Sequence, residues 1–137
     1  MPTAREHVAS CAMGGKLIVI GGWAGNARIV VGAVESYDPA NDAWTRLPDL
    51  PTARGGLGAV VIGDVCYAIG GEHWTSDFPG TFDRNEGFSG GHWTSFAPMP
   101  TARHGLGLAA ADGAVYAIGG GPAMGNSYTD VVEVFRP

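Results

Sequence analysis

Pro-Thr-Ala-Arg occurs three times in this chain of 137 residues, at 2–5, 51–54 and 100–103. Successive copies lie 49 residues apart, and an Ile-Gly-Gly follows each of them at the same spacing, at 20–22, 69–71 and 118–120. A fixed period of this length with strand-like content indicates one supersecondary unit that is copied and stacked. We therefore expect three repeats, at about 2–50, 51–99 and 100–137.

The third copy shows how the unit is built. Residues 105–111 are apolar and end at Asp112-Gly113, a two-residue hairpin signal, after which residues 114–118 form a second strand. A variable loop follows, and residues 131–135 then alternate between apolar and polar side chains, which predicts a third strand. We name these strands A, B and C, and together they indicate an antiparallel meander.

The first copy supplies the fourth strand. Its strand C is Val34–Tyr37, a turn follows at 38–42, and strand D runs through Trp44. In the second copy we expect Thr81–Asp83 to replace strand C, with Trp93 in strand D. A shorter B–C connection would then offset a longer C–D connection and preserve the period.

The inner strands predict how the copies stack. Strands A and B are apolar on both faces, so neighbouring copies must cover them on both sides. Small residues occupy matched places in strand A, at Ala9, Gly58 and Gly107, as sheets that converge on an axis require. Radially repeated four-stranded sheets form a β-propeller. The expected fold is therefore all-β, with two complete blades and a third blade of three strands.

The residues that recur in register resemble those of the kelch repeat. They are the glycine pair after strand B, the aromatic-Asp pair of strand C (Tyr37-Asp38), the tryptophan of strand D (Trp44, Trp93) and the Pro-x-x-Arg before strand A. Phe82 and Phe135 stand in place of the tyrosine. The resemblance covers essentially the whole chain. It implies a ring of six or seven blades, with partners bound on the side of the D–A and B–C loops.

Three blades do not close such a ring, and the third lacks strand D. Blades 1 and 3 would each expose an apolar face, which marks an association surface. We expect either a second copy of the chain or the missing half of a longer propeller to complete the ring.

One edge of the blades carries the candidate site. The start of A, the end of B, the start of C and the end of D share one rim of a meander. Residues present in every copy serve the blade, so we expect Arg5, Arg54 and Arg103 to bond strand-end carbonyls or a carboxylate such as Glu35 or Glu133. The alternative is that these arginines form a positive ring that accepts acidic groups of a ligand.

Residues present in a single copy are better candidates for binding, because the blade does not need them. Aromatic side chains beside Asn, Asp and Arg suit stacking on a sugar or holding a peptide side chain. With the three arginines, the predicted rim comprises Glu6, His7, Trp23, Asn26, Arg28, Glu72, His73, Trp74, Asp77, His104, Met124, Asn126 and Tyr128.

These features favour a binding module for a protein or a carbohydrate, without a metal or another cofactor. The four histidines lack metal-ligand spacing. A copper oxidase on this kind of propeller would need histidine ligands and a cysteine crosslinked to a tyrosine, but neither cysteine of this chain lies in a rim loop. The alternative is a carbohydrate-active propeller, either a lectin-like binder or a sugar mutarotase or epimerase. Its acid-base and clamp residues would be drawn from Glu6, His7, Glu72 and Arg54.

Composition limits the partners further. The net charge of −5 argues against nucleic acid, which binds basic surfaces, and no apolar run is long enough to span a membrane. No signal sequence is visible, so the localisation stays unknown. Cys11 and Cys66 align with apolar residues in the other copies, and we expect them to be two small buried residues that do not form a disulfide.

Overall fold

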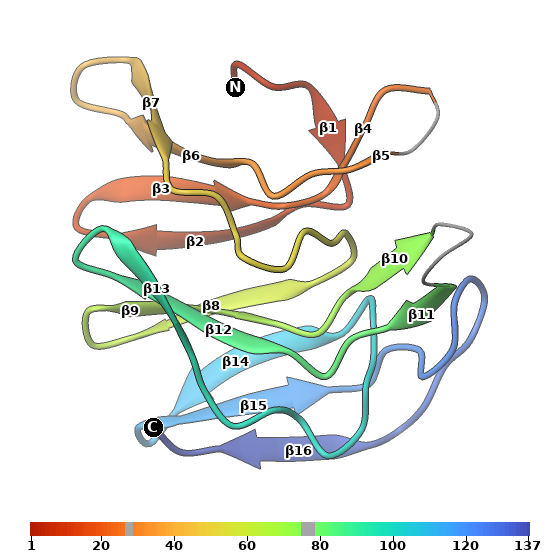
Figure 1. Cartoon of the computed structure of the whole chain (residues 1–137). Coiled ribbons are helices and arrows are strands. Elements are labelled where there is room, and N and C mark those ends of the chain that lie inside the picture. The colour runs from red at the N-terminus through yellow and green to blue at the C-terminus, as the bar shows by residue number, and fades with distance from the viewer. Residues whose placement is uncertain (27–28, 75–78) are drawn as a thin grey trace.

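The computed structural model describes residues 1–26, 29–74 and 79–137, and in them three antiparallel sheets stack one on the next (Figure 1). The first blade consists of β2 (Ala9–Met13), β3 (Lys16–Ile20), β6 (Val34–Asp38) and β7 (Ala43–Leu47), in that order across the sheet. The second blade consists of β8 (Gly58–Ile62), β9 (Val65–Ile69), β12 (Asn85–Ser89) and β13 (His92–Ser95). The third consists of β14 (Gly107–Ala111), β15 (Ala114–Ile118) and β16 (Val132–Phe135).

These sheets confirm the expected all-β fold and its division into four, four and three strands. The predicted hairpin at Asp112-Gly113 is present: Ala111 pairs directly with Ala114, and both turn residues have positive φ, at 49° and 69°. That backbone conformation matches the twist of the flanking strands, so the turn fixes their register. The described residues contain no helix long and apolar enough to cross a membrane.

The B–C connections form small sheets of their own, which the sequence did not lead us to expect. β4 (Trp23–Ala24) pairs with β1 (Arg5–Glu6) and with β5 (Ile29–Val30), and β10 (Glu72–Trp74) pairs with β11 (Pro79–Thr81). All five strands lie on the same side of the stack, the right side of Figure 1, opposite the A–B and C–D turns. We call this side the rim.

The prediction for strand C of the second blade was wrong. Thr81 lies in β11, paired with Glu72, and strand C is β12, which begins four residues further on at Asn85. The longer connection is therefore B–C and the shorter one is C–D, the reverse of our expectation.

The physical reason is a buried glutamate. Glu86 and Phe88 of β12 occupy the places that Glu35 and Tyr37 occupy in β6, so the match to strand C is Glu-x-aromatic. The rings of Phe88 and Trp93 have centroids 5.2 Å apart, and the equivalent rings of Tyr37 and Trp44 have centroids 5.0 Å apart. Phe88, and not Phe82, is therefore the residue that replaces the tyrosine.

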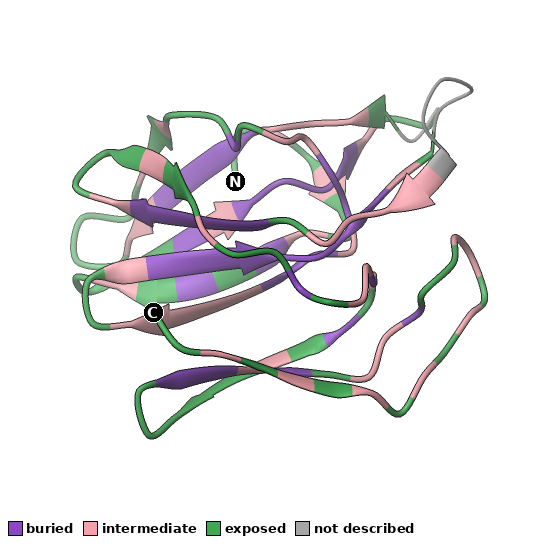
Figure 2. Cartoon of the chain, turned by 60° about the horizontal axis from the view of Figure 1, so that its bottom comes forward, coloured by how far each residue is buried: buried purple, intermediate pink, exposed green. Residues whose placement is uncertain are grey.

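The core lies between the blades. β8 packs against β2 on one side and β14 on the other, which places the second blade in the middle (Figure 1), and Figure 2 shows buried residues gathered on strands inside the stack. Its inner strands account for much of the buried surface, with Cys66 and Ala68 fully buried. A side chain at Gly58 would put its Cβ 2.6 Å from Cγ of Leu108, so the close approach of the third blade requires glycine there.

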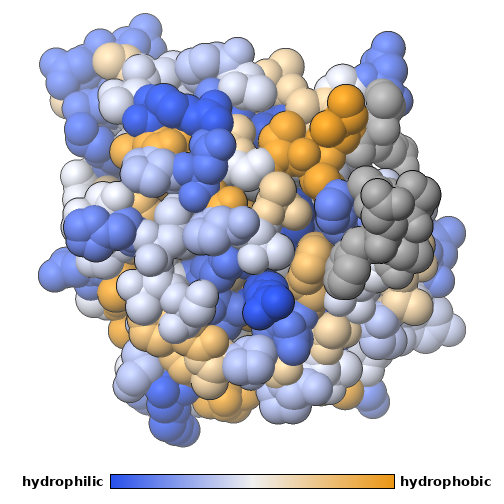
Figure 3. All heavy atoms as spheres, viewed as in Figure 1, coloured by the Kyte–Doolittle hydropathy of each residue, from blue (hydrophilic) through white to orange (hydrophobic). Residues whose placement is uncertain are grey.

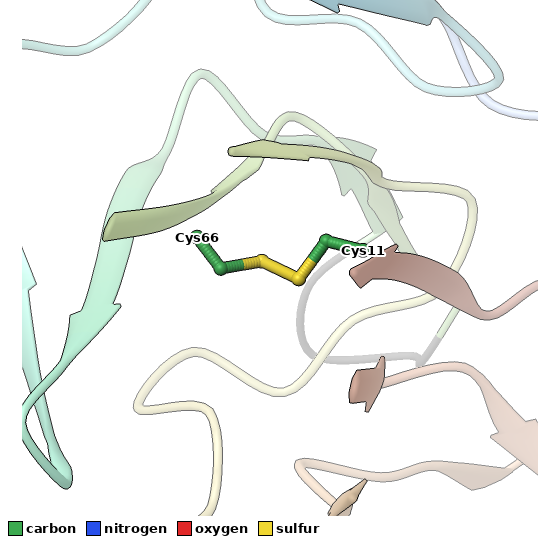
Figure 4. Close-up of a disulfide and its surroundings, with 2 residues drawn as sticks. All are labelled: Cys11 and Cys66. Atoms are coloured by element: carbon green, nitrogen blue, oxygen red, sulfur yellow. A yellow bond between two sulfur atoms is a disulfide. The ribbon is translucent and has the colours of Figure 1, made fainter. Parts of the chain in front are cut away.

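Cys11 and Cys66 form a disulfide, contrary to our expectation (Figure 4). Cys11 lies in β2 and Cys66 in β9, so the bond joins the first blade to the second. The alignment of the copies compares equivalent positions and does not show that the inner strands of adjacent blades face each other, so the pairing was missed. The two residues are 55 apart in sequence, and closing a loop of that length stabilises the folded state by about 4 kcal/mol on chain-entropy grounds.

The outer face of the third blade is apolar and open, as the repeat pattern predicted. Val132 and Val134 of β16 are 55% and 49% exposed, and Ile118, the cross-strand neighbour of Val132, is 47% exposed. On the first blade, Leu17 of β3 is exposed to a similar extent.

Candidate functional site

Each blade holds a buried arginine just below the rim. Arg54 is fully buried, and its Nε donates to the carbonyl of Gly70 at 2.6 Å, while its second terminal nitrogen donates to Ala68 at 2.9 Å. Its first terminal nitrogen contacts a carboxylate oxygen of Glu86 at 2.5 Å. These bonds tie the end of strand B and the start of strand C to the segment that leads into strand A.

The same arrangement recurs in the other blades and confirms the expected contacts with Glu35 and Glu133. Arg5 meets Glu35 at 2.6 Å, and Arg103 meets Glu133 at 2.9 Å, each with further bonds to strand-end carbonyls. The guanidinium groups have no exposed surface. The structure therefore places the three predicted rim arginines inside the blades, where they do not form an open ring for acidic ligands.

Burial and pairing act against each other in these ion pairs. Burial lowers the pKa of the Arg54 guanidinium from its usual value, and Glu86 opposes that effect. Burial also acts to raise the pKa of Glu35, but hydrogen bonds from Arg5 and Thr3 outweigh it and hold that pKa below its ordinary value. The charged pairs are thus stabilised by one another inside the protein.

Above the arginines, a backbone hydrogen-bond chain crosses the blades. Residues 7, 56 and 105 are equivalent in the three copies, and all have positive φ, at 54°, 63° and 61°. The amide of Gly56 donates to the carbonyl of His7 at 2.9 Å, and the amide of Gly105 donates to the carbonyl of Gly56 at 2.7 Å. Two copies use glycine for this conformation, whereas His7 adopts it at a cost of roughly 1–2 kcal/mol.

Residues with strained backbone conformations cluster at functional sites, and His7 is such a residue. The imidazole of His7 stacks on the indole of Trp23, with ring centroids 4.3 Å apart. Trp23 is buried and extends over the second blade, where a Cβ at Gly55 would lie 2.5 Å from its Nε1. The side chains of the first blade thus occupy space that glycine leaves open in the second.

The second blade contributes Glu72 and Trp74 from one face of β10. The indole Nε1 of Trp74 donates to Oε2 of Glu72 at 2.8 Å, and the ring centroid lies 6.1 Å from that of Trp23. Glu72 is 3% exposed and Trp74 is 42% exposed, so the carboxylate lies below the protein surface and the indole lies at the surface beside it.

The third blade contributes His104, which fixes a loop. Its Nδ1 and Nε2 lie 3.1 Å from the carbonyl oxygens of Gly121 and Gly125, respectively, and Nδ1 lies 3.7 Å from Oε2 of Glu72. A Cβ at Gly125 would lie 3.7 Å from the Trp74 ring, so His104 holds this loop beside the indole.

A pocket of about 360 Å³ lies between these groups, and we call it the rim pocket. It is lined by His7, Trp23, Gly56, Glu72, Trp74, His104, Gly105, Gly125 and Asn126. Six of the residues predicted from the sequence therefore come together, two from each blade. The lining glycines were missed as site residues, although Gly56 and Gly105 align with His7 in the repeat, which could have indicated them.

The other predicted rim residues lie elsewhere. Glu6 and Asn26 line a neighbouring depression with Arg5 and Trp23. His73 lies on the other face of β10 and stacks with Phe82 at 6.4 Å, and Tyr128 is 93% exposed. Met124 is half-buried in the third B–C loop. Arg28 and Asp77 lie outside the described residues.

The surface around the rim is also apolar in places. Figure 3 shows hydrophobic spheres gathered at the upper right, where Figure 1 places β4 and β5. Ile29 of β5 is 64% exposed there. Within the described ranges, no group of three or more His, Cys, Asp and Glu side chains could hold a metal ion.

Comparison with known proteins agrees with the repeated blade structure. Residues 4–51 match the family model of the kelch motif. The chain is 34% identical over 90 residues to the F-box protein AFR of Arabidopsis thaliana, covering 64% of the chain and 24% of that protein. It is 34% identical over 97 residues to the Kelch-like protein terF of Aspergillus terreus, covering 61% and 20%. It is 35% identical over 77 residues to the mouse influenza virus NS1A-binding protein homolog, covering 56% and 12%.

The chain carries a kelch motif at residues 4–51 and resembles kelch-repeat proteins, a family whose members commonly mediate protein–protein interaction. It spans about a quarter or less of the length of these relatives.

The buried ion pairs generate a stability prediction. Glu86→Gln removes the charge that compensates Arg54, so we expect it to lower the free energy of unfolding by about 3–5 kcal/mol, measured with guanidinium chloride. The matched control is Asp64→Asn, an exposed acid in the A–B turn at the opposite edge, which should change it by less than about 0.5 kcal/mol. Equal effects of the two substitutions would contradict the structural role of the pair.

Proposed function

We propose that the chain is a binding module and that its ligand docks in the rim pocket. The observation that carries this proposal is convergence: side chains that the repeat does not require meet at one place from three blades. His7 is held there in a strained conformation, and Trp74 offers an exposed indole that no blade needs. Aromatic side chains of this kind dominate the energetics of protein interfaces.

A protein partner is the first candidate ligand, because kelch relatives commonly act through such partners. A carbohydrate is the second candidate, because an exposed indole beside a carboxylate and the amide of Asn126 also suits a sugar face. The mutarotase or epimerase alternative loses its clamp, since Arg54 is fully buried and bonded to Glu86.

Peptide display tests the proposal. We expect the immobilised chain to enrich a shared motif from a random peptide library on phage. The Trp74→Ala variant should lose that enrichment, because it removes the exposed wall of the pocket. The Asp64→Ala variant should retain it, because Asp64 lies at the opposite edge.

A parallel glycan array separates the two candidate ligands. Glycans that bind the chain and not its Trp74→Ala variant would favour the carbohydrate. Binding of neither peptides nor glycans, or binding that the variant retains in full, would contradict a ligand site at the rim pocket.

We further propose that a second copy of the chain covers the outer face of the third blade. Ile118, Val132 and Val134 form an apolar surface on that face, opposite the side on which β14 packs against β8. The first blade presents the complementary outer face, which carries Leu17. Two copies related by a twofold axis would bury both faces twice and close a ring of six blades.

Light scattering of the purified chain tests this pairing. We expect a mass twice that of one chain, and a single-chain mass for Val134→Lys, which puts a charge into the apolar face. Val134 is half exposed in one chain, so the substitution should leave the fold intact, and circular dichroism checks that. A single-chain mass for the unmodified protein at high micromolar concentration would contradict the pairing.

A further inference from the structure

We infer that the rim pocket receives a cationic side chain of the protein partner, and arginine in the first place. This inference rests on the proposed function of the same pocket and specifies the chemistry that the pocket recognises. It follows from the carboxylate at the bottom of the pocket, the indole at its wall and the charges around it.

The carboxylate of Glu72 is the first element. It is 97% buried, and Oε2 accepts the indole N–H of Trp74. Oε1 faces the second-blade glycine, where a Cβ at Gly56 would lie 3.7 Å away. A carboxylate has several acceptor positions, so a donor that enters the pocket can bond to it without displacing the indole.

The residues that the structure describes balance the charge on Glu72 only in part. Nδ1 of His104 lies 3.7 Å from Oε2 of Glu72, which is longer than a hydrogen bond. Both nitrogens of His104 already face carbonyl oxygens, at 3.1 Å. The arginines below the rim are bonded to their own glutamates. A buried carboxylate in this situation favours a cationic ligand and disfavours an anionic one.

The aromatic wall is the second element. Trp74 is 42% exposed, so one part of its ring is open to the pocket while its N–H is held by Glu72. Indole is the best aromatic partner of a cation placed over its face. A guanidinium group is planar, so it can lie against the indole and donate to the carboxylate at the same time, which an ammonium group does less well.

The remaining walls leave room for a long side chain. Gly56, Gly105 and Gly125 contribute backbone only, and His104 holds the loop of Gly125 beside the indole. The volume of about 360 Å³ is large enough to admit an extended side chain such as that of arginine. The net charge of −5 attracts a basic partner over longer distances.

Small-molecule titration tests the inference. The probes are the N-acetyl amides of arginine, lysine and norleucine, followed through the indole resonances in NMR spectra. We expect arginine to bind most tightly, and about tenfold more tightly than norleucine, which has the aliphatic chain without the charge. Glu72→Gln should abolish that tenfold preference while Asp64→Asn retains it.

A second variant guards against misfolding. If the spectrum of Glu72→Gln shows loss of fold, Trp74→Leu replaces it and should likewise remove the preference. Equal binding of arginine and norleucine by the unmodified chain overturns the inference, as does an arginine preference that survives both variants.

The two proposals can fail separately. A rim-dependent peptide motif without Arg or Lys overturns the cation inference and leaves the binding module in place. A motif with an arginine whose replacement by citrulline weakens binding at least tenfold supports both.

Discussion

A buried arginine–glutamate pair inside each blade holds the strand ends in place. Arg54 joins the carbonyls of Gly70 and Ala68 to Glu86, and so fixes the ends of three strands at one point. Because the pair is buried, removing one partner leaves a charge in the interior, which is far more costly than the net gain from forming the pair. The pair therefore dictates where strand C begins, and the B–C connection varies in length to satisfy it.

Fixed strand ends allow the rim to vary. The positions of His7, Gly56 and Gly105 share one backbone conformation, yet only the first carries a side chain. Glycine in the second blade leaves room for bulky side chains: Trp23 of the first blade extends over Gly55, and Glu72 of the second blade approaches Gly56. The residues that line the pocket thus differ between the copies. The residues that the copies share pack the blades in register and so bring the lining residues together.

The sequence predicted much of this arrangement and failed at three places: strand C of the second blade, the contact between the first two blades, and the rim hairpins. Period, strand order and the role of the arginines followed from repetition, which acts as an internal control. The second strand C was misplaced because an aromatic-Asp pair was matched in place of the buried Glu86. The disulfide between Cys11 and Cys66 was missed because contacts between blades do not show in an alignment of copies. The rim hairpins were missed because their short strands have no clear alternation.

Residues shared by the copies build the blades, whereas single-copy rim residues do not. The unfolding free energy of His7→Gly tests this division, because that substitution gives the first blade the residue of the other two. Relief of the left-handed strain, roughly 1–2 kcal/mol, offsets the lost stacking on Trp23, about 0.5–1.5 kcal/mol. We predict a stability within about 1 kcal/mol of the unmodified chain. A loss of about 3 kcal/mol or more, as from a broken buried ion pair, would contradict the account.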